Sequence, residues 1–331
     1  MTGWVLGVDS GGSGLRCALA PCAGPERASP APRPAGRVVT GGPVRTGPGG
    51  IDAEDLLRRL LPAVRALLAE AGAVPGADPP PLRAVCVGAA GMATLGERLR
   101  AALPGALAGA FGVTRWALAA DAVTAYAGAL GERPGAVVAA GTGVIALGTD
   151  LRTWRRADGW GHLLGDCGGG AWIGRAGLEA ALRSHDARPH GSAALRARAE
   201  AAFGPLAGLP AALYPRDDRA AVLASFAPDV AACARTDAVA EDVLRRAAGH
   251  LAGSAAAVCP GGDAALAFTG GLLRLGAPLL VPLRAELDAR LPHVRLAEPA
   301  ADPLGGALLI ARQHAAGTLA LPPDAALLRL G

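Results

Sequence analysis

The sequence predicts an α/β protein of two domains, in which mixed β-sheets are flanked by helices. Apolar strand-like runs alternate with segments of helical spacing, and a strand, glycine turn and strand pattern occurs twice, near residues 3–20 and 135–150. The repeat suggests two related halves, and 331 residues are enough for two cores. We place the domains at 1–119 and 120–331, and leave open that the last helix packs back on the first domain.

The composition is that of an ordinary folded protein, with 51% hydrophobic and 18% charged residues. The formal net charge is only +4, and the basic residues are all arginines that alternate with Asp and Glu, so nothing indicates a nucleic-acid surface. The six cysteines form no CxxC pair, which favours reduced thiols. We see neither a signal peptide nor a membrane-spanning run, and expect a cytoplasmic protein.

The first half begins with the hairpin at residues 3–20. A third strand follows in GRVVTGG, and the apolar spacing from Ile51 to Gly72 predicts a helix with Asp52 near its N-cap. Two buried strands, 82–91 and 115–121, flank a short helix at 95–103. Apolar strands joined by helices indicate a sheet covered on both faces.

The second half is predicted to be mainly helical after its own hairpin. A single strand, AALAFTGG, interrupts the central helices, and a short strand at HVRLAE precedes the last helix. The expected helices are 122–130, 171–184, 193–202, 217–232, 236–258, 278–290 and 304–314.

The first group of residues with chemical potential lies in the opening hairpin: Asp9, Gly11, Gly12, Ser13 and Arg16. Glycines let backbone N–H groups approach phosphate oxygens, a serine adds a hydroxyl donor, and an aspartate can hold Mg²⁺ directly or through water. The turn therefore indicates a phosphate site. A plain hairpin turn that carries Asp and Gly remains the alternative.

Two further glycine turns follow predicted strands. The first could hold the other side of the same phosphates, and the second could let an adenine ring lie against bare backbone, with an arginine one turn further on. The alternatives are an ordinary hairpin and an ordinary strand-to-helix turn. The first turn comprises Gly141, Thr142 and Gly143. The second comprises Gly270 and Gly271, and its arginine is Arg274.

Two aspartates are candidates for acid–base chemistry or substrate binding. Asp121 ends the strand WALAA, where a carboxylate could accept a hydroxyl proton as that oxygen attacks a phosphate, or could simply cap the next helix. Asp166 lies in the glycine-dense GWGHLLGDCGGG and could accept hydrogen bonds from substrate hydroxyls, or form an Asx-turn.

Several of these motifs occur in the order found in one family. DSGGSGLR, the aspartate of AADAVTAYAG, AAGTG, GWGHLLGD with WIG, and FTGG resemble the BadF/BadG/BcrA/BcrD-type ATPases, above all their N-acetylglucosamine and glucosamine kinase members. The resemblance implies the actin-like (ribonuclease H-like) two-domain fold with ATP in the interdomain cleft. It further implies transfer of the γ-phosphoryl group from Mg-ATP to a hydroxyl of an amino sugar, with the 6-hydroxyl as the expected site, and a homodimer.

The resemblance also assigns roles to residues. Asp9 and its glycines would hold Mg-ATP, Thr142 would meet the phosphates, Gly270 and Gly271 would border the adenosine, and Asp121 would be the catalytic base. The acceptor sugar would contact Gly159, Trp160 and Asp166. Arg45 occupies the position at which an asparagine contacts the sugar in some relatives. Its guanidinium could bind a carboxylate, or the side chain could simply pack on the surface.

Two other functions stay open at this point. The acceptor pocket differs from the human-type kinases at Arg45, Val144, Ile145 and Cys167, which leaves room for a nucleotide-dependent sensor without turnover. The family also includes dehydratase activators that share an iron–sulfur cluster between subunits, although Val138 and Ala139 lead into the AAGTG turn here rather than a cysteine. Acceptor-stimulated ADP release and anaerobic iron analysis separate these alternatives from an amino-sugar kinase.

Overall fold

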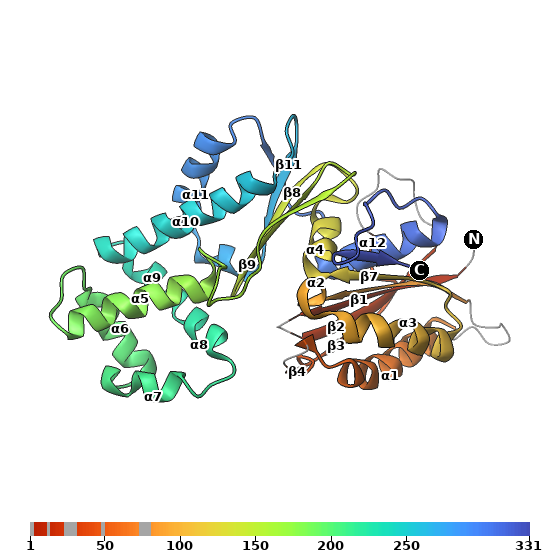
Figure 1. Cartoon of the computed structure of the whole chain (residues 1–331), viewed down its shortest axis with the longest axis horizontal. Coiled ribbons are helices and arrows are strands. Elements are labelled where there is room, and N and C mark those ends of the chain that lie inside the picture. The colour runs from red at the N-terminus through yellow and green to blue at the C-terminus, as the bar shows by residue number, and fades with distance from the viewer. Residues whose placement is uncertain (1–2, 12–13, 23–31, 48–49, 73–80) are drawn as a thin grey trace. The chain divides into compact units, whose positions relative to one another are not determined.

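The computed structural model describes residues 3–11, 14–22, 32–47, 50–72 and 81–331. The chain splits into two compact units (Figure 1). Unit 1 comprises Met1–Val137, Thr149–Trp154 and Ala297–Gly331, and unit 2 comprises Val138–Gly148 and Arg155–Leu296. The two compact units do not divide the chain between residues 119 and 120. The domain boundary expected there stays a prediction.

A six-stranded mixed sheet forms the centre of unit 1, as the sequence predicts. β1 pairs antiparallel with β2 to form the predicted hairpin, and parallel with β6, which in turn pairs parallel with β7. The strand order is β13 (Leu328–Leu330), β7 (Arg115–Ala120), β6 (Leu82–Ala89), β1 (Trp4–Gly11), β2 (Gly14–Pro21) and β3 (Val39–Gly41).

Helices cover both faces of this sheet (Figure 1). α1 (Ala53–Ala71) and α3 (Glu97–Phe111) lie on one face, with the short α2 (Met92–Leu95) before α3. α4 (Asp121–Leu130) and α12 (Pro303–Ala316) lie on the other. The predicted helix at 51–72 is confirmed, with Asp52 as N-cap. The helix predicted at 95–103 is wrong in length, because the apolar positions Leu99, Leu103 and Leu107 continue the buried face for another turn.

Glycines let α4 and α12 approach each other and the sheet closely. A Cβ on Gly306 of α12 would lie 1.9 Å from the backbone oxygen of Thr124, and one on Gly128 of α4 would lie 2.3 Å from that of Asp302. In the sheet, a Cβ on Gly7 would meet Leu308 at 2.7 Å. These contacts leave no room for larger residues, so they fix where α4 begins relative to β1.

Unit 2 contains most of a five-stranded sheet with predominantly helical segments around it. Its strand order is β10 (Trp154–Asp158), β9 (Val144–Thr149), β8 (Gly135–Ala140), β11 (Ala265–Thr269) and β12 (Arg295–Leu296). β10, and β13 in unit 1, are strands that the sequence did not indicate. The helices are α5 (Gly170–His185), α6 (Ala193–Phe203), α7 (Leu209–Leu213), α8 (Arg219–Ser225), α9 (Ala227–Cys233), α10 (Ala238–Val258) and α11 (Ala277–Arg290).

The single helix predicted at 217–232 is wrong. The structure has two helices there, because Pro228 lies in the first turn of α9 and has no backbone N–H with which to continue α8. Phe226 joins the two helices and is fully buried. Among the helices that the structure describes, none is long and apolar enough to cross a membrane.

The close contact of α4 and α12 gives a first prediction. Gly306→Ala should destabilise the protein by about 1–3 kcal/mol, because the new methyl group overlaps the Thr124 backbone oxygen and the helices must move apart. Thermal and urea denaturation measure the change. Gly105→Ala on exposed α3 is the matched control, since a Cβ there meets nothing within 4 Å, and it should stabilise by roughly 0.5–1 kcal/mol. Equal stability of Gly306→Ala and the original protein would contradict the packing.

Candidate active site

The carboxyl ends of three parallel strands meet at one edge of the unit 1 sheet. Ser10 of β1 is in register with Ala89 of β6, and Ala89 with Ala120 of β7. Asp121 follows directly, while Asp9 precedes Ser10. Since neighbouring strands are about 4.8 Å apart, the backbones at Asp9 and Asp121 lie on the order of 10 Å apart, with β6 between them. The sequence therefore brings two carboxylates to the same edge, where parallel sheets bind ligands.

Asp9 is held by an arginine on the paired strand. Arg16 is its cross-strand partner and donates to Asp9 Oδ2 from Nη2 at 2.6 Å and from Nε at 3.2 Å. Arg16 Nη1 also donates to Asp302 Oδ2 at 2.6 Å, and Asp302 Oδ1 caps α12 through Gly305 N. Burial raises the pKa of Asp9, and the pairing with Arg16 opposes that shift. Arg16 thus links two carboxylates at the edge of the sheet.

Glycines stand at the facing ends of β1 and β2. Gly14 has φ +146°, and a Cβ there would lie 2.5 Å from the Gly41 oxygen, so only glycine fits. A Cβ on Gly11 would meet nothing within 4 Å. Gly12 and Ser13, predicted to bind phosphate, lie outside the described residues. Ser10 Oγ is buried and has no hydrogen-bond partner among the described residues, which fits a turn that completes its polar contacts with a bound phosphate chain.

Asp121 is the first residue of α4 rather than its N-cap, which is Ala120. The expected cap position is therefore off by one residue, and a role at the start of the helix stays compatible with a catalytic one. Its Oδ1 accepts the N–H of Ala122 at 2.9 Å, and its backbone oxygen accepts the Thr124 hydroxyl at 2.9 Å. The side chain is half-buried. A negative charge is stabilised in the first turn of a helix, so the carboxylate is kept in place at the strand end.

In unit 2, the glycine turn after β8 is held against the start of α5. Gly170 N donates to Gly141 O at 2.8 Å, and Ala171 N donates to Thr142 O at 2.9 Å. These two bonds use carbonyl oxygens of the turn and leave the Thr142 side chain exposed. An exposed hydroxyl on a fixed glycine turn is suited to donate to a phosphate oxygen.

The second glycine pair of unit 2 lies beside this turn. Gly270 follows β11, the neighbour of β8, and a Cβ on it would lie 2.2 Å from the Ala140 oxygen. Its φ of +105° also requires glycine. Gly271 is exposed, and the Arg274 guanidinium folds back towards it, 2.8 Å from where a Cβ would be. An open backbone surface with a cationic rim can accept a flat aromatic base.

Asp166 adjoins the same turn from the other side. A Cβ on Gly143 would lie 2.1 Å from Asp166 Oδ2, and Asp166 Oδ1 accepts the N–H of Gly161 at 3.1 Å. Burial raises the pKa of Asp166, and the nearby negative charge of Asp158 raises it as well. The backbone N–H groups that donate to the carboxylate lower the pKa and so oppose this shift. Asp166 has φ +54°, a conformation that aspartate tolerates better than most residues.

The loop that carries Gly159 and Trp160 is fixed by a carboxylate that the sequence did not single out. Asp158 Oδ1 accepts the N–H of Asp166 at 3.0 Å, and its Oδ2 accepts the hydroxyl of Ser254 on α10 at 2.5 Å. Arg156 lies over the Trp160 ring, 4.5 Å from its centroid, while 62% of Trp160 stays exposed. An exposed indole on a braced loop can stack on a ligand ring.

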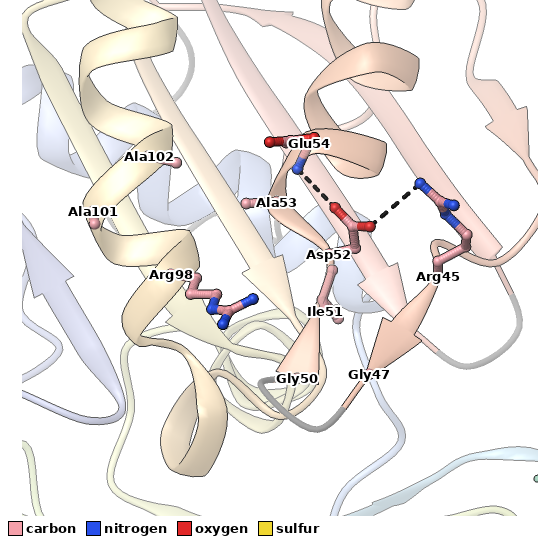
Figure 2. A pocket seen from close by; sticks show the side chains of 10 residues that line it. All are labelled: Arg45, Gly47, Gly50, Ile51, Asp52, Ala53, Glu54, Arg98, Ala101 and Ala102. Carbon is pink, nitrogen blue, oxygen red and sulfur yellow. Dashed lines mark hydrogen bonds and ion pairs between the residues drawn. The ribbon is translucent and has the colours of Figure 1, made fainter.

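Arg45 lies elsewhere in unit 1, beside a pocket of about 700 Å³ (Figure 2). The pocket is formed by the small hairpin of β4 (Thr46–Gly47) and β5 (Gly50–Ile51), the start of α1 and the start of α3. Its lining residues are Arg45, Gly47, Gly50, Ile51, Asp52, Ala53, Glu54, Arg98, Ala101 and Ala102.

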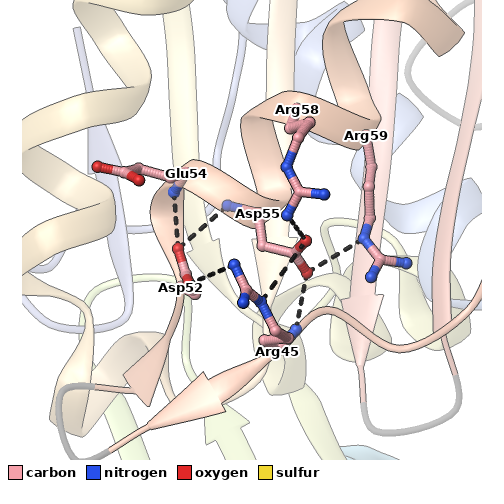
Figure 3. A network of polar contacts seen from close by, with 6 residues as sticks. All are labelled: Arg45, Asp52, Glu54, Asp55, Arg58 and Arg59. Atoms are coloured by element: carbon pink, nitrogen blue, oxygen red, sulfur yellow. Dashed lines mark hydrogen bonds and ion pairs between the residues drawn. The ribbon is translucent and has the colours of Figure 1, made fainter.

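A buried carboxylate anchors the segment with Arg45 (Figure 3). The side chain of Asp55 is only 1% exposed. Its Oδ2 accepts a hydrogen bond from the backbone N–H of Arg45 at 3.0 Å and lies 3.1 Å from Arg59 Nε, while its Oδ1 accepts a hydrogen bond from the Arg58 guanidinium. The Arg45 guanidinium lies 3.3 Å from Asp52 Oδ2 and 3.8 Å from Asp55 Oδ1. The hydrogen bond from Arg45 N–H is the main cause that lowers the pKa of Asp55.

The structure thus gathers the candidate residues into two groups, one in each unit. Asp9, Gly11, Arg16 and Asp121 share one sheet edge in unit 1. Gly141–Gly143, Gly270, Gly271 and Asp166 adjoin one another in unit 2, with Gly159 and Trp160 in the loop next to Asp166. Sequence reasoning missed Asp302, Asp158, Ser254, Asp55 and Arg98. The Asp-Pro before α12 was a readable N-cap signal for Asp302, whereas the others depend on tertiary contacts.

Comparison with known proteins identifies the family. A model of the BadF/BadG/BcrA/BcrD ATPase family matches residues 6–311. The chain belongs to this family. The matched range includes all three glycine turns, Asp121 and the Trp160 loop, so the resemblance read from these motifs is confirmed at the level of the family.

Individual relatives of this family member point in the same direction. The N-acetylmuramic acid/N-acetylglucosamine kinase of Clostridium acetobutylicum is 44% identical over 69 residues, a match that spans 20% of this chain and 22% of that relative. A candidate N-acetylglucosamine kinase of Chromobacterium violaceum is 27% identical, with a TM-score of 0.69 over 93% of this chain and 98% of that one.

The fold extends to a more distant protein. A ROK family glucokinase of Streptomyces griseus, solved with glucose and AMPPNP, has a TM-score of 0.53 at 20% identity over 94% of this chain and 100% of that one. The similarity shows a shared fold. The predicted fold class, two mixed α/β units of the actin-like ATPase type, is confirmed.

The bracing of the Trp160 loop is testable. Asp158→Ala removes the acceptor of both the Asp166 N–H and the Ser254 hydroxyl, so the amides of Gly161 and Asp166 should exchange with solvent about 10-fold faster or more. Hydrogen exchange followed by mass spectrometry or NMR measures this. Ser225→Ala is the control, because that hydroxyl donates to Val222 O of its own helix, and exchange in the loop should not change. Unaltered exchange in Asp158→Ala would contradict the bracing role.

The Asp55 cluster predicts a pH dependence. Because the folded protein lowers the pKa of Asp55, its contribution to stability is complete above the ordinary value of about 3.9 and is lost as the pH falls through the folded pKa. Asp55→Asn should therefore melt at a lower temperature than the original protein at pH 7, and the gap should narrow towards pH 3. The exposed Asp263→Asn serves as control. A gap that stays constant over this range would contradict the charged role of Asp55.

Proposed function

We propose that this protein transfers the γ-phosphoryl group of ATP to a hydroxyl of an amino sugar. The observation that carries the proposal is the register of β1, β6 and β7, which brings the Asp121 carboxylate to the same sheet edge as the phosphate-type turn after Asp9. A base beside a phosphate site is what phosphoryl transfer to a hydroxyl requires, and a protein that only binds nucleotide needs no base there.

In unit 1, Asp121 accepts the proton of the attacking hydroxyl at its carboxylate. The helix start at α4 keeps that carboxylate fixed, so little reorganisation is needed as the proton moves. Asp9 would hold the magnesium ion, since none of the described groups donates to its Oδ1. Arg16, together with backbone N–H groups of the turn from Gly11 to Ser13, orients and neutralises the phosphates.

In unit 2, the turn Gly141–Gly143 offers backbone N–H groups and the Thr142 hydroxyl to the phosphates. Gly270 and Gly271 leave room for the adenosine, and Arg274 borders it. When bound, Mg-ATP supplies the γ-phosphoryl group and the cation that balances its charge. Asp166, Gly159 and Trp160 bind the sugar, with the carboxylate of Asp166 accepting hydrogen bonds from sugar hydroxyls and the indole lying along the ring.

The acceptor class rests on the relatives. The names of the Clostridium and Chromobacterium proteins both include N-acetylglucosamine, and the first also includes N-acetylmuramic acid. We assign the 6-hydroxyl as the site of transfer because it is the primary hydroxyl and the least hindered. The enzyme is proposed to act in the cytoplasm as a homodimer.

Asp121→Asn tests the base. The amide keeps the shape of the carboxylate but cannot accept the proton, so turnover should fall by roughly 10²–10⁴-fold while ATP binding persists. A coupled ADP assay with a panel of amino sugars measures turnover, and calorimetry measures ATP binding. The control is Asp263→Asn in an exposed loop of unit 2, which should keep full turnover. Phosphotransfer near the original rate in Asp121→Asn would refute the assignment.

A further inference from the structure

A segment of residues 318–331, here called the strap, follows α12 and closes one side of the unit 1 sheet. Its last residues include β13, which pairs antiparallel with β7 so that Leu328 lies opposite Ala119. The two neighbours of β7 are β13 and β6, so without the strap one row of its backbone N–H and C=O groups would be unpaired. Leu321 is 1% exposed and Leu328 is fully buried, and both anchor the strap. The mechanism above gives this segment no role.

A hydrogen bond between the strap and β7 falls one residue before the proposed base. The N–H of Ala120 donates to the backbone oxygen of Leu327 at 2.8 Å, and Asp121 follows at once. The Asp121 carboxylate in turn accepts the N–H of Ala122 at 2.9 Å, at the start of α4. The strap therefore holds the strand end from which the carboxylate projects.

An aspartate fixes the turn that presents the Leu327 oxygen. Asp324 Oδ1 accepts the backbone N–H groups of Ala326 and Leu327, each at 2.8 Å. The backbones of Asp324 and Leu328 also bond each other in both directions, at 2.8 and 3.1 Å. An aspartate that bonds the backbone ahead of it in this way holds a turn in one shape. Asp324 thus sets the direction of the carbonyl group that meets Ala120.

Arg100 ties the same turn to the end of the strand beside β7. Its side chain is 9% exposed, and its Nη2 donates to Ala326 O at 3.0 Å and also to Met92 O. Met92 begins α2, shortly after β6 ends. The N–H of Ala90, also just past β6, donates to Ser10 O of β1 at 2.9 Å. A chain of hydrogen bonds thus runs across the ends of the three parallel strands.

Proton transfer makes strict demands on the place of Asp121. A base works only within hydrogen-bond reach of the proton that it accepts, and a displacement of about 1 Å can lower turnover about 10²-fold. If the end of β7 frayed, the carboxylate at the junction of strand and helix could shift by that much. Asp9 and Arg16, which are proposed to hold Mg-ATP, are fixed separately by their pairing with each other and with Asp302. Loss of the strap bond should therefore impair catalysis more than ATP binding.

We propose that the strap positions the catalytic carboxylate of Asp121 through the hydrogen bond between Ala120 and Leu327, with Asp324 and Arg100 as positioning residues. The inference rests on the proposed function, because it assigns support to the base of that reaction. Asp324 and Arg100 act through the turn at residues 324–328, and the turn acts through the end of β7.

Steady-state kinetics of Asp324→Ala with amino sugars and ATP test the inference. The variant loses both side-chain bonds of the turn, so kcat should fall roughly 10-fold or more while KM for ATP stays unchanged. Asp324→Asn keeps an oxygen that can accept the same N–H groups and should restore most of kcat. A purely structural role would lower the melting temperature without separating kcat from KM. Arg100→Met removes the donor to Ala326 O and should lower kcat in the same way, and full kcat in this variant would refute the role of Arg100.

Asp150→Ala is the matched control. Asp150 Oδ1 accepts the backbone N–H groups of Arg152 and Thr153, each at 2.9 Å, in the turn between β9 and β10. Like Asp324, it is exposed and bonds the residues two and three positions further on. The control should therefore lower the melting temperature about as much as Asp324→Ala does and leave kcat unchanged. Thermal melting also confirms that each variant is folded at the assay temperature.

The outcomes separate this inference from the kinase function. If a sugar is phosphorylated and Asp324→Ala lowers kcat no more than Asp150→Ala does, the positioning role is refuted and the kinase stands. If the original protein phosphorylates no sugar, the kinase fails, and amide exchange followed by NMR decides on the strap. The N–H of Ala122 reports on the Asp121 carboxylate that accepts it. Faster exchange of this N–H in Asp324→Ala than in the original protein supports the positioning role, and equal exchange refutes it.

Discussion

The parallel register of β1, β6 and β7 is the constraint that positions the candidate residues of unit 1. It brings the ends of three strands to one level, so that residues more than a hundred positions apart in the chain, Asp9 and Asp121, reach the same edge. On one face of the sheet, Gly128 and Gly306 let the backbones of α4 and α12 come into direct contact, which supports this arrangement. A change there would move Asp121 without touching it.

Charged groups in the protein are arranged in linked sets. Arg16 joins Asp9 to Asp302 and so ties the phosphate-type turn to the start of α12. Asp55 joins Arg58, Arg59 and the segment of Arg45, and Asp158 joins the Trp160 loop to α10. In each set one buried or half-buried group fixes an exposed neighbour. Rigid support of this kind is what a binding site needs if its groups are to be placed before the ligand arrives.

The sequence predicted the elements with strong local signals. The opening hairpin, the helix after Asp52 and the strand that ends at Ala120 follow from apolar spacing and turn residues, and the motifs indicated the family that the comparison then showed. The split near Phe226 and the short strands β10 and β13 were missed, because tertiary packing rather than periodicity decides them. Asp158 and Arg98 were missed for a similar reason: their partners and pockets come from distant segments, which one sequence does not reveal.

Transfer of the γ-phosphoryl group of ATP to an amino sugar is the activity proposed for this site. Incubation with γ-labelled ATP and N-acetylglucosamine or N-acetylmuramic acid, followed by NMR and mass spectrometry of the product, tests it most directly. The expected product is a labelled sugar 6-phosphate, formed together with one ADP per sugar. Label that appears only as inorganic phosphate, at a rate independent of any sugar, would contradict it.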